Sequence, residues 1–371
     1  MALWKGDVDM VSVSGLEGIV AAETEIGLVD GESGRLVYRG CEAKELAGTH
    51  SFEQVAHLLW FGHLPGEVER ENLAAELRRH REVPVEILRL IDQLPPGLDM
   101  MSVLRTAVSM MGVDGGWPPT VSQAIRFTAA IPTVIAHRHA RMRGVAPTAA
   151  NPALSHVANY LFMLGDGRLP SHEHLHALEA YLVLAMEHGM NASTFAARVV
   201  TSTQADMASA LTAAIGAMKG PLHGGAPSEV MTMLEEIGTP ERAEEWLRSE
   251  LQAGRRLMGF GHRVYKTRDP RAMALRTVVA GLSESDPWFD LAVAVENRAV
   301  RLLAEHKPGR HLYANVEYWA AAILRTTGIP KPLYTPTFTV GRCVGWTAHV
   351  LEQAAHNRLI RPRAVYTGPM P

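Results

Sequence analysis

The sequence predicts an all-α fold that is interrupted near its start by one small β-hairpin. Apolar residues recur at helical spacing in about a dozen segments, which together span most of the chain. Gly- and Pro-containing stretches at 112–120 and 144–152 read as surface connections between such segments. Only segment 24–40 alternates apolar residues around glycine turns, which is the pattern of a hairpin. Its two strands should contain Ile26 and Leu28, and then residues 36–38.

The helices follow in order along the chain. Residues 52–61 place their apolar side chains near one face, Ser51 is a suitable N-cap, and the Leu-Pro-Gly sequence at 64–66 ends the segment. Residues 67–81 alternate charged residues with leucines at helical spacing. The same reasoning predicts further helices at 84–93, 100–111, 121–143, 152–164, 172–186, 193–218, 240–256, 286–305, 317–327 and 337–356.

Composition narrows the class of protein. A chain of 371 residues with a net charge of −3 has no basic surface of the kind that nucleic-acid binding requires. No apolar run reaches the roughly 18 to 20 residues that cross a bilayer, and acidic residues near the N-terminus argue against a secretory signal. Cys41 and Cys343 form no metal-ligand pattern, and so few cysteines suit a reducing cytoplasm. We therefore expect a soluble cytoplasmic protein without membrane or nucleic-acid partners.

Two segments place a histidine at a turn between helices. In the first, His188 follows an apolar helix, and Asn191 and Ser193 can cap the next helix. Taken alone, this segment reads as a helical corner with a structural histidine. In the second, His223 is surrounded by glycines just before a helix that begins near Pro227. The positive end of that helix favours a neutral imidazole, which can donate to a developing oxyanion; the alternative is a glycine turn with an incidental histidine.

Two further segments concentrate charge. Residues 259–271 begin Gly-x-Gly-His and then hold several basic residues, which can clamp carboxylates and phosphates, although a solvated charged loop has the same composition. Asn315 can cap a helix whose first turn contains Glu317, where the dipole stabilises a carboxylate. A single Glu at this position can serve merely to stabilise the helix start, and this is the alternative to a functional role for Glu317. Three histidines at 172, 174 and 176 resemble a metal site, but only the first and last share a helical face, so a polar helix start is the preferred interpretation.

These segments, in this order, resemble the citrate synthase family. The resemblance is carried by GLEGIVAAETEIGLVDGESGRLVYRG, EHGMNASTFAARV, GPLHGGA, GFGHRVYKTRDPR and GRCVGWTAHVLEQ…RLIRPRAVYTGP, and it extends over residues 15–371. It implies a large helical domain built from 1–218 and 325–371, a small helical domain at 219–324, and a homodimer. It also implies no metal and no bound cofactor, with acyl-CoA as a substrate.

Site residues follow from the same resemblance, position by position. The family motifs imply a catalytic set of His223, His262 and Glu317. They imply oxaloacetate ligands at His188, Asn191, His262, Arg271, Arg342 and Arg361, the last reaching across the dimer to the partner's site. They imply contacts to CoA at Arg263 and Lys266.

The implied reaction is condensation of acetyl-CoA, or propionyl-CoA, with oxaloacetate to give citrate, or 2-methylcitrate, and free CoA. The sequence departs from the family's usual pattern at Glu317, where Asp is common, and also within 226–228 and 98–100. One extra methylene moves a carboxylate by about 1 Å, which can cost about 10²-fold in rate when geometry is strict. The alternative is therefore a catalytically weak relative that binds oxaloacetate or CoA in a regulatory role.

Overall fold

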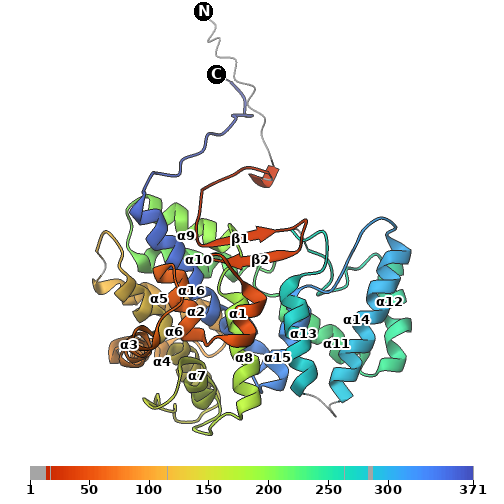
Figure 1. Cartoon of the computed structure of the whole chain (residues 1–371), viewed down its shortest axis with the longest axis horizontal. Coiled ribbons are helices and arrows are strands. Elements are labelled where there is room, and N and C mark those ends of the chain that lie inside the picture. The colour runs from red at the N-terminus through yellow and green to blue at the C-terminus, as the bar shows by residue number, and fades with distance from the viewer. Residues whose placement is uncertain (1–13, 17, 115, 263, 283–286, 371) are drawn as a thin grey trace, which may run out of the picture.

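The fold was analysed in a computed structural model that describes residues 14–16, 18–114, 116–262, 264–282 and 287–370. It confirms a largely helical protein with a small sheet near its start (Figure 1). Strands β1 (Gly27–Asp30) and β2 (Arg35–Tyr38) pair antiparallel, with Gly27 opposite Tyr38, as the alternating pattern predicts. A third short strand that the sequence analysis did not predict, β3 (Cys41–Glu42), pairs with β2. Arg39 and Gly40 both have positive φ, 46° and 88°, which is the backbone that a tight two-residue hairpin turn needs.

The helices run in chain order as follows: α1 (Ala43–Thr49), α2 (Phe52–Phe61), α3 (Glu67–Arg79), α4 (Val85–Gln93), α5 (Met100–Met110), α6 (Val121–Met142), α7 (His156–Leu164), α8 (His172–Ala185), α9 (Ala192–Ser202), α10 (Met207–Met218), α11 (Ala226–Ile237), α12 (Ala243–Gln252), α13 (Pro270–Leu282), α14 (Pro287–His306), α15 (Val316–Thr326) and α16 (Tyr334–Ala355). Short 3₁₀ turns lie at Ser14–Leu16, Met111–Asp114, Pro240–Arg242 and Lys331–Leu333.

Besides shifts of a few residues at helix ends, such as the start of α7 at His156 instead of 152, the observed helices differ from the predicted ones in three ways. The helix predicted at 193–218 is two helices, because Gln204 has a positive φ of 66° and Asp206 starts a new helix by accepting from the Ser209 N–H at 2.9 Å. Helix α1 was not predicted. Helix α13 was also not predicted, since the charged stretch that precedes it reads as loop and its apolar residues follow no clear helical stripe.

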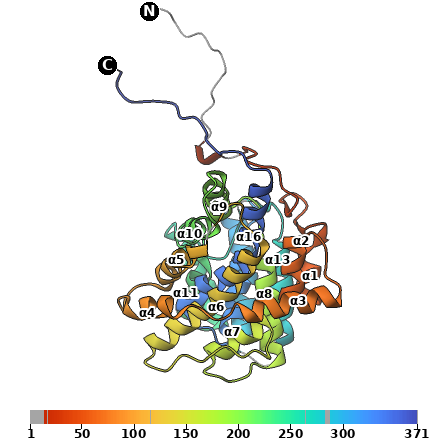
Figure 2. The same cartoon turned by 90° about the vertical axis from the view of Figure 1, so that its left-hand side faces the viewer.

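Helix α16 is the centre of the larger group of helices. It is buried on nearly all sides and packs against α2, α6, α8 and α9 (Figures 1 and 2). Glycines allow the close approach to α8: a Cβ at Gly341 would lie 2.7 Å from the Leu182 carbonyl oxygen, and one at Gly345 would lie 2.0 Å from that of Met186. The end of α8 is therefore held firmly against α16, and this junction is where the first histidine segment lies.

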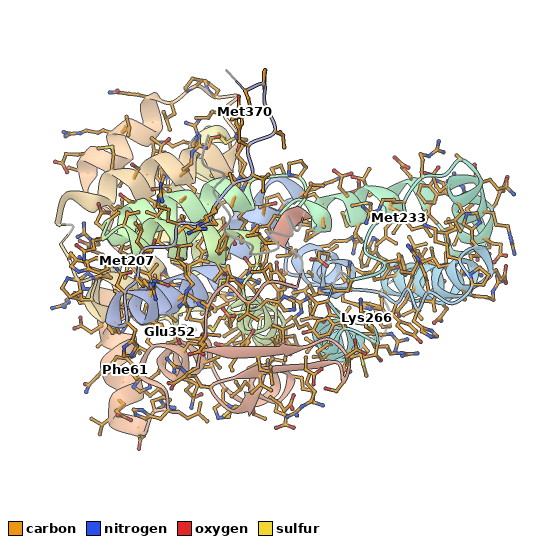
Figure 3. The ribbon with its side chains drawn as sticks, turned by 90° about the horizontal axis from the view of Figure 1, so that it is seen from above. Phe61, Met207, Met233, Lys266, Glu352 and Met370 are labelled. Atoms are coloured by element: carbon orange, nitrogen blue, oxygen red, sulfur yellow. The ribbon has the colours of Figure 1, made fainter. Side chains whose placement is uncertain are left out.

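Helices α11 to α14 lie together at one end of the molecule, with α15 between them and the larger group (Figure 1). Figure 3, seen from above, labels Met233 and Lys266 on that side and Met207 and Phe61 on the other. Helices α13 and α15 both contact α8. This arrangement brings His188, His262, Arg271 and Glu317 to one junction. The division into a large and a small domain, with boundaries at 219 and 324, remains a prediction. No helix in the described part of the chain combines the length and apolar character that a membrane span requires.

Candidate active site

The corner between α8 and α9 presents His188. Asn191 caps α9 as predicted, since its Oδ1 accepts from the Thr194 N–H at 3.1 Å. Gly189 has a φ of +61°, a backbone conformation that suits glycine and sharpens the turn. Burial, together with the charge of Arg271, lowers the pKa of His188 well below its usual value, so its imidazole is neutral.

The loop at 259–271 folds His262, Asp269 and Arg271 towards this corner, while Lys266 and Arg268 remain exposed. The rings of His188 and His262 meet edge to face with 5.4 Å between centroids, and His188 Nε2 lies 3.2 Å from the Tyr265 hydroxyl. Gly259 adopts a φ of +82°, and a Cβ there would lie 2.8 Å from Val230 Cγ2. The glycines that precede His262 are therefore structural requirements of this loop, and the segment is a built site rather than a solvated charged loop.

His262 is oriented by its own loop. Its Nδ1 accepts from the backbone N–H groups of Val264 and Tyr265, each at 3.0 Å, so the ring proton lies on Nε2. That nitrogen is 3.3 Å from Nη2 of Arg271. Two donors this close cannot bond to one another, so an acceptor oxygen that enters beside them can receive from both. Burial, aided by the Arg271 charge, lowers the pKa of His262 to about 4 and keeps it neutral.

Asp269 was not singled out in the sequence, yet it organises this region. Its carboxylate holds the buried Arg271 in an ion pair at 2.8 Å and accepts from the Val316 N–H at 3.1 Å. It thereby satisfies a free N–H at the start of α15 and ties Arg271 to the helix that carries Glu317. The prediction that the Asn315 side chain caps α15 is wrong, because its amide instead donates to the Gly261 carbonyl at 3.0 Å.

Glu317 lies in the first turn of α15, and it faces the interior. Its Oε2 is buried and has no hydrogen-bond partner among the described residues. Burial raises the pKa of this carboxyl, while the charges of Arg271 and Arg342 oppose the rise. The backbone N–H of Glu317 also lowers the pKa by a hydrogen bond, so an interaction with the start of α15 accounts for part of this position but leaves Oε2 without a partner. Oε2 is thus a buried, unsatisfied acceptor close to two guanidinium groups.

His223 lies between α10 and α11, just before the helix start, as predicted. Its Nε2 is 2.7 Å from the Ser193 hydroxyl, which also accepts from the Trp346 indole at 3.0 Å. Burial, with Arg342 as the next contribution, lowers the pKa of His223 to about 4. Ser193 does not cap α9. It holds the imidazole instead, a role that sequence reasoning missed.

The segments on either side of His223 explain two departures from the family pattern. Lys219, at the start of its loop, pairs with Asp99 Oδ2 at 3.0 Å, and Asp99 also caps α5 by accepting from the Ser102 N–H. Pro227 is buried in the first turn of α11, where proline fits. Both residues thus have structural roles beside the loop.

Arg342 projects from α16 into the same region and is 2% exposed. Its Nε donates to the Ala185 carbonyl at 2.6 Å, and its guanidinium lies 4.7 Å from the centre of the Phe338 ring. No carboxylate of the described residues lies within ion-pair distance of it. A buried guanidinium without a counter-ion is costly, so the pocket is suited to an incoming carboxylate.

The remaining candidates lie away from this cluster. Lys266 is exposed, and its backbone N–H donates to the Gly31 carbonyl at 2.9 Å, which fastens the loop to the hairpin. Arg361 is exposed on the extended segment that leaves the body after α16 (Figure 1). Arg263 lies outside the described residues. Within this chain, the structure therefore gathers the candidate residues at positions 188, 223, 262, 271, 317 and 342. It does not bring Arg361 to them.

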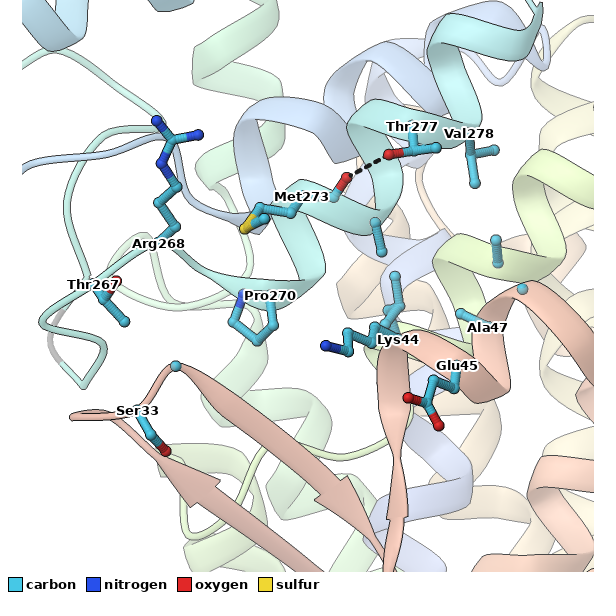
Figure 4. A pocket seen from close by; sticks show the side chains of 15 residues that line it. Ser33, Lys44, Glu45, Ala47, Thr267, Arg268, Pro270, Met273, Thr277 and Val278 are labelled. Atoms are coloured by element: carbon cyan, nitrogen blue, oxygen red, sulfur yellow. Dashed lines mark hydrogen bonds between the residues drawn. The ribbon is translucent and has the colours of Figure 1, made fainter.

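Two other features fall outside the cluster. A cavity of about 730 Å³ lies between the hairpin, α1, α8 and α13 (Figure 4), and it is lined by none of the candidate site residues. The histidines at 172–176 begin α8, capped by Ser171 as a polar helix start, and the one potential metal-ligating group in the described part of the chain is His57, His63 and Glu69 instead.

The lowered imidazole pKa values predict a pH dependence of stability. Between the ordinary value of 6.5 and about 4, the unfolded chain takes up protons that folded His223 and His262 do not. The free energy of unfolding should therefore fall as pH drops through this range. Denaturant titrations at several pH values measure it, and His262→Asn should have a shallower slope than the wild type. Identical slopes would contradict the assigned neutral imidazole.

Comparisons with known proteins agree with this geometry. The sequence model described as "Citrate synthase, C-terminal domain" matches residues 15–363. The chain is 39% identical to a citrate synthase of Haloferax volcanii, with 95% of each chain covered. It is also 39% identical to a 2-methylcitrate synthase of Mycobacterium tuberculosis, with 95% of this chain and 90% of the relative covered.

Solved structures show the same likeness. The citrate synthase of Thermotoga maritima superposes with a TM-score of 0.87 at 38% identity, over 96% of each chain. The enzyme of Thermoplasma acidophilum, solved as a ternary complex with carboxymethyl coenzyme A and oxaloacetate, superposes with a TM-score of 0.89 at 30% identity, again over 96% of each chain. The chain therefore belongs to the citrate synthase family.

Proposed function

We propose that this protein condenses a short acyl-CoA with oxaloacetate to give citrate, or 2-methylcitrate, and free CoA. The observation that carries the proposal is the meeting of His262 and Arg271 as two donors, together with the buried Glu317 Oε2, which has no hydrogen-bond partner among the described residues and feels the charge of Arg271. Oxaloacetate supplies the acceptor oxygens for the donors. The acyl thioester supplies the weakly acidic proton that the carboxylate removes.

The proposed binding step uses the buried arginines. Arg271 and Arg342 each receive a carboxylate of oxaloacetate, while His188, Asn191 and His262 fix the rest of the molecule. Arg342 supports this step because it is buried without a carboxylate partner among the described residues. Charge-assisted contacts from planar guanidinium groups orient a dicarboxylate firmly. Outside the pocket, exposed Lys266 offers positive charge to the CoA phosphates, and Arg263 of the same motif is proposed as a second CoA contact.

In the proposed chemical step, Glu317 removes a proton from the acyl carbon next to the thioester. His223 donates a hydrogen bond to the thioester oxygen, which stabilises the enol that forms. In the structure the single Ser193 hydroxyl proton goes to Asn191 Oδ1 at 2.7 Å, so this donation requires the hydroxyl to turn and donate to His223 Nε2, which places the ring proton on Nδ1.

The enol carbon then attacks the ketone carbon of oxaloacetate, and a carbon–carbon bond forms. His262 donates the proton on Nε2 to the ketone oxygen as it becomes a hydroxyl. Water subsequently cleaves the thioester to release CoA, and the proton that Glu317 took from the acyl carbon replaces the one that His262 gave. The sequence of steps balances without a metal or a bound cofactor.

The experiment that tests this function measures CoA release with a thiol reagent, in the presence and absence of oxaloacetate. We expect oxaloacetate-dependent release from acetyl-CoA or propionyl-CoA. Since the two acyl groups differ by one methylene, a pocket should discriminate between them by about 1–3 kcal/mol, and the ratio of kcat/KM values identifies the preferred substrate. Tight oxaloacetate binding without release from either thioester would instead favour the catalytically weak regulatory protein.

The proposed assembly is a homodimer in the cytoplasm. Arg361 supports the dimer, because it lies on an extended, exposed segment that does not return to the site of its own chain. We propose that it reaches the oxaloacetate carboxylate in the partner's site. The unpaired thiols of Cys41 and Cys343 suit a reducing compartment.

Arg361→Ala should raise the oxaloacetate KM by on the order of tenfold and leave the acyl-CoA KM unchanged, because it removes one charged contact to a carboxylate. Arg363→Ala, two residues further along the same exposed segment, is the matched control. Steady-state kinetics of both variants provide the measurement. Equal oxaloacetate KM values in Arg361→Ala and the wild type would remove this residue from the site.

A further inference from the structure

Behind His188 lies a buried polar group that the proposed chemistry does not use. The carboxylate of Glu187 and the ring of His349 are both fully buried and lie 3.0 Å apart. One Glu187 oxygen accepts from His349 Nε2, and the other accepts from the backbone N–H of Gly189. Glu187 and Gly189 are the two neighbours of His188, so this carboxylate closes a tight turn with His188 at its apex.

Arg198 determines which way His349 faces. A guanidinium can only donate, and its Nη1 lies 2.9 Å from Nδ1 of His349. The ring proton therefore lies on Nε2, where it points at Glu187. Arg198 is itself held by Glu352 at 2.7 Å. The chain of hydrogen bonds thus runs in one direction, from Arg198 through His349 to the turn that presents His188.

The same arginine also anchors the C-terminal segment. Its Nε donates to Gln353 Oε1 at 3.1 Å, and the Gln353 amide donates in turn to the Arg358 carbonyl at 3.4 Å. Two residues later, the Ile360 N–H donates to the Ser202 hydroxyl at 3.0 Å. The segment that carries Arg361 is therefore fixed at its root by the same hydrogen-bonded group.

We infer that Arg198, His349 and Glu187 form a positioning unit for oxaloacetate. The unit holds His188 against Tyr265 and His262 at one end, and the root of the Arg361 segment at the other. A buried polar network is a poor way to gain stability alone, since well-packed apolar residues serve as well. One end of this network instead lies at His188 and the other at the Arg361 segment, and both are proposed contacts of oxaloacetate. The inference rests on the proposed function, because it takes oxaloacetate as the molecule that both ends meet.

Arg198→Met tests this unit, with Arg138→Met as a matched control. Arg138 is equally buried, at 3% against 4%, and its guanidinium donates to backbone carbonyls such as Ile91 at 2.9 Å, within α4–α6. Isothermal titration with oxaloacetate should show a dissociation constant raised by on the order of tenfold in Arg198→Met and unchanged in Arg138→Met. Both variants should unfold at lower temperature, so the affinity, and not the stability, separates positioning from a merely structural role.

Glu187→Gln provides a second, isosteric variant. An amide cannot accept from both Gly189 and His349, so one end of the turn must open. We expect a similar loss of oxaloacetate affinity, and in kinetics a raised oxaloacetate KM with the acyl-CoA KM unchanged. This variant decides the question if Arg198→Met does not fold.

Wild-type affinity in either folded variant would overturn the inference, as would an equal loss of affinity in Arg138→Met. The proposed function fails separately. If the wild type binds oxaloacetate but releases no CoA from any short acyl-CoA, condensation is wrong, while the loss of oxaloacetate affinity in the two variants would still support the positioning unit.

Discussion

Replacement of Glu317 by Gln should lower kcat by on the order of 10³, because the amide cannot accept the acyl proton that the carboxylate removes. The dissociation constant of oxaloacetate should stay within about twofold of the wild type, since Gln preserves shape and the oxaloacetate ligands are other residues. Thiol-release kinetics and calorimetric titration measure the two quantities. The buried Oε2 and the raised pKa of Glu317 motivate the prediction.

Glu179→Gln is the control for this variant. Burial raises the pKa of Glu179 to about 7, yet its carboxylate accepts from the Phe52 N–H at 2.9 Å and has no place in the cluster. Its kcat should equal that of the wild type. Glu317→Asp should fall between wild type and Gln, because it retains a carboxylate that is displaced by about 1 Å. Undiminished turnover in Glu317→Gln would exclude this residue as the base.

Replacement of His262 by Asn should lower kcat by on the order of 10² to 10³, the range for loss of one donor to a developing oxyanion. Asn is the informative choice, because its Oδ1 can replace Nδ1 as acceptor for the backbone N–H groups of Val264 and Tyr265. The loop is thereby kept, while the donor at Nε2 is lost. His262→Gln instead places an N–H near that position and should recover part of the rate. Equal kcat in His262→Asn and the wild type would remove the proton donor from the proposed mechanism.

Much of the fold follows from patterns that span single segments. The hairpin was predictable because alternation and glycine turns occur within seventeen residues, and α2 because Ser51 and the 64–66 sequence bracket an apolar stripe. The break between α9 and α10 at Gln204 was not predictable, because the helical spacing of apolar residues continues across it. Only the positive φ of Gln204 marks the break. Helix α13 escaped prediction for the opposite reason, since charge just before it obscured its start at Pro270.

The site shows the same division. The histidines and arginines carry the recognisable chemistry of their motifs, whereas Tyr265, Asp269 and Ser193 lie in the same motifs but each make a contact far away in sequence that only the fold reveals. Asp269 meets Val316 across 47 positions, and Ser193 meets Trp346 across 153. Nothing local marks such residues, although the aspartate lies within the charged loop and could have been suspected as a partner for Arg271.

The central claim is that this site joins the acyl carbon to oxaloacetate through an enol. Incubation with oxaloacetate and acetyl-CoA that carries three deuterons on its methyl group tests it directly, with the products analysed by mass spectrometry. The account predicts citrate with two deuterons, because one is removed before the new bond forms. Free acetate with all three deuterons, released together with CoA and without citrate, would show thioester hydrolysis and contradict the account.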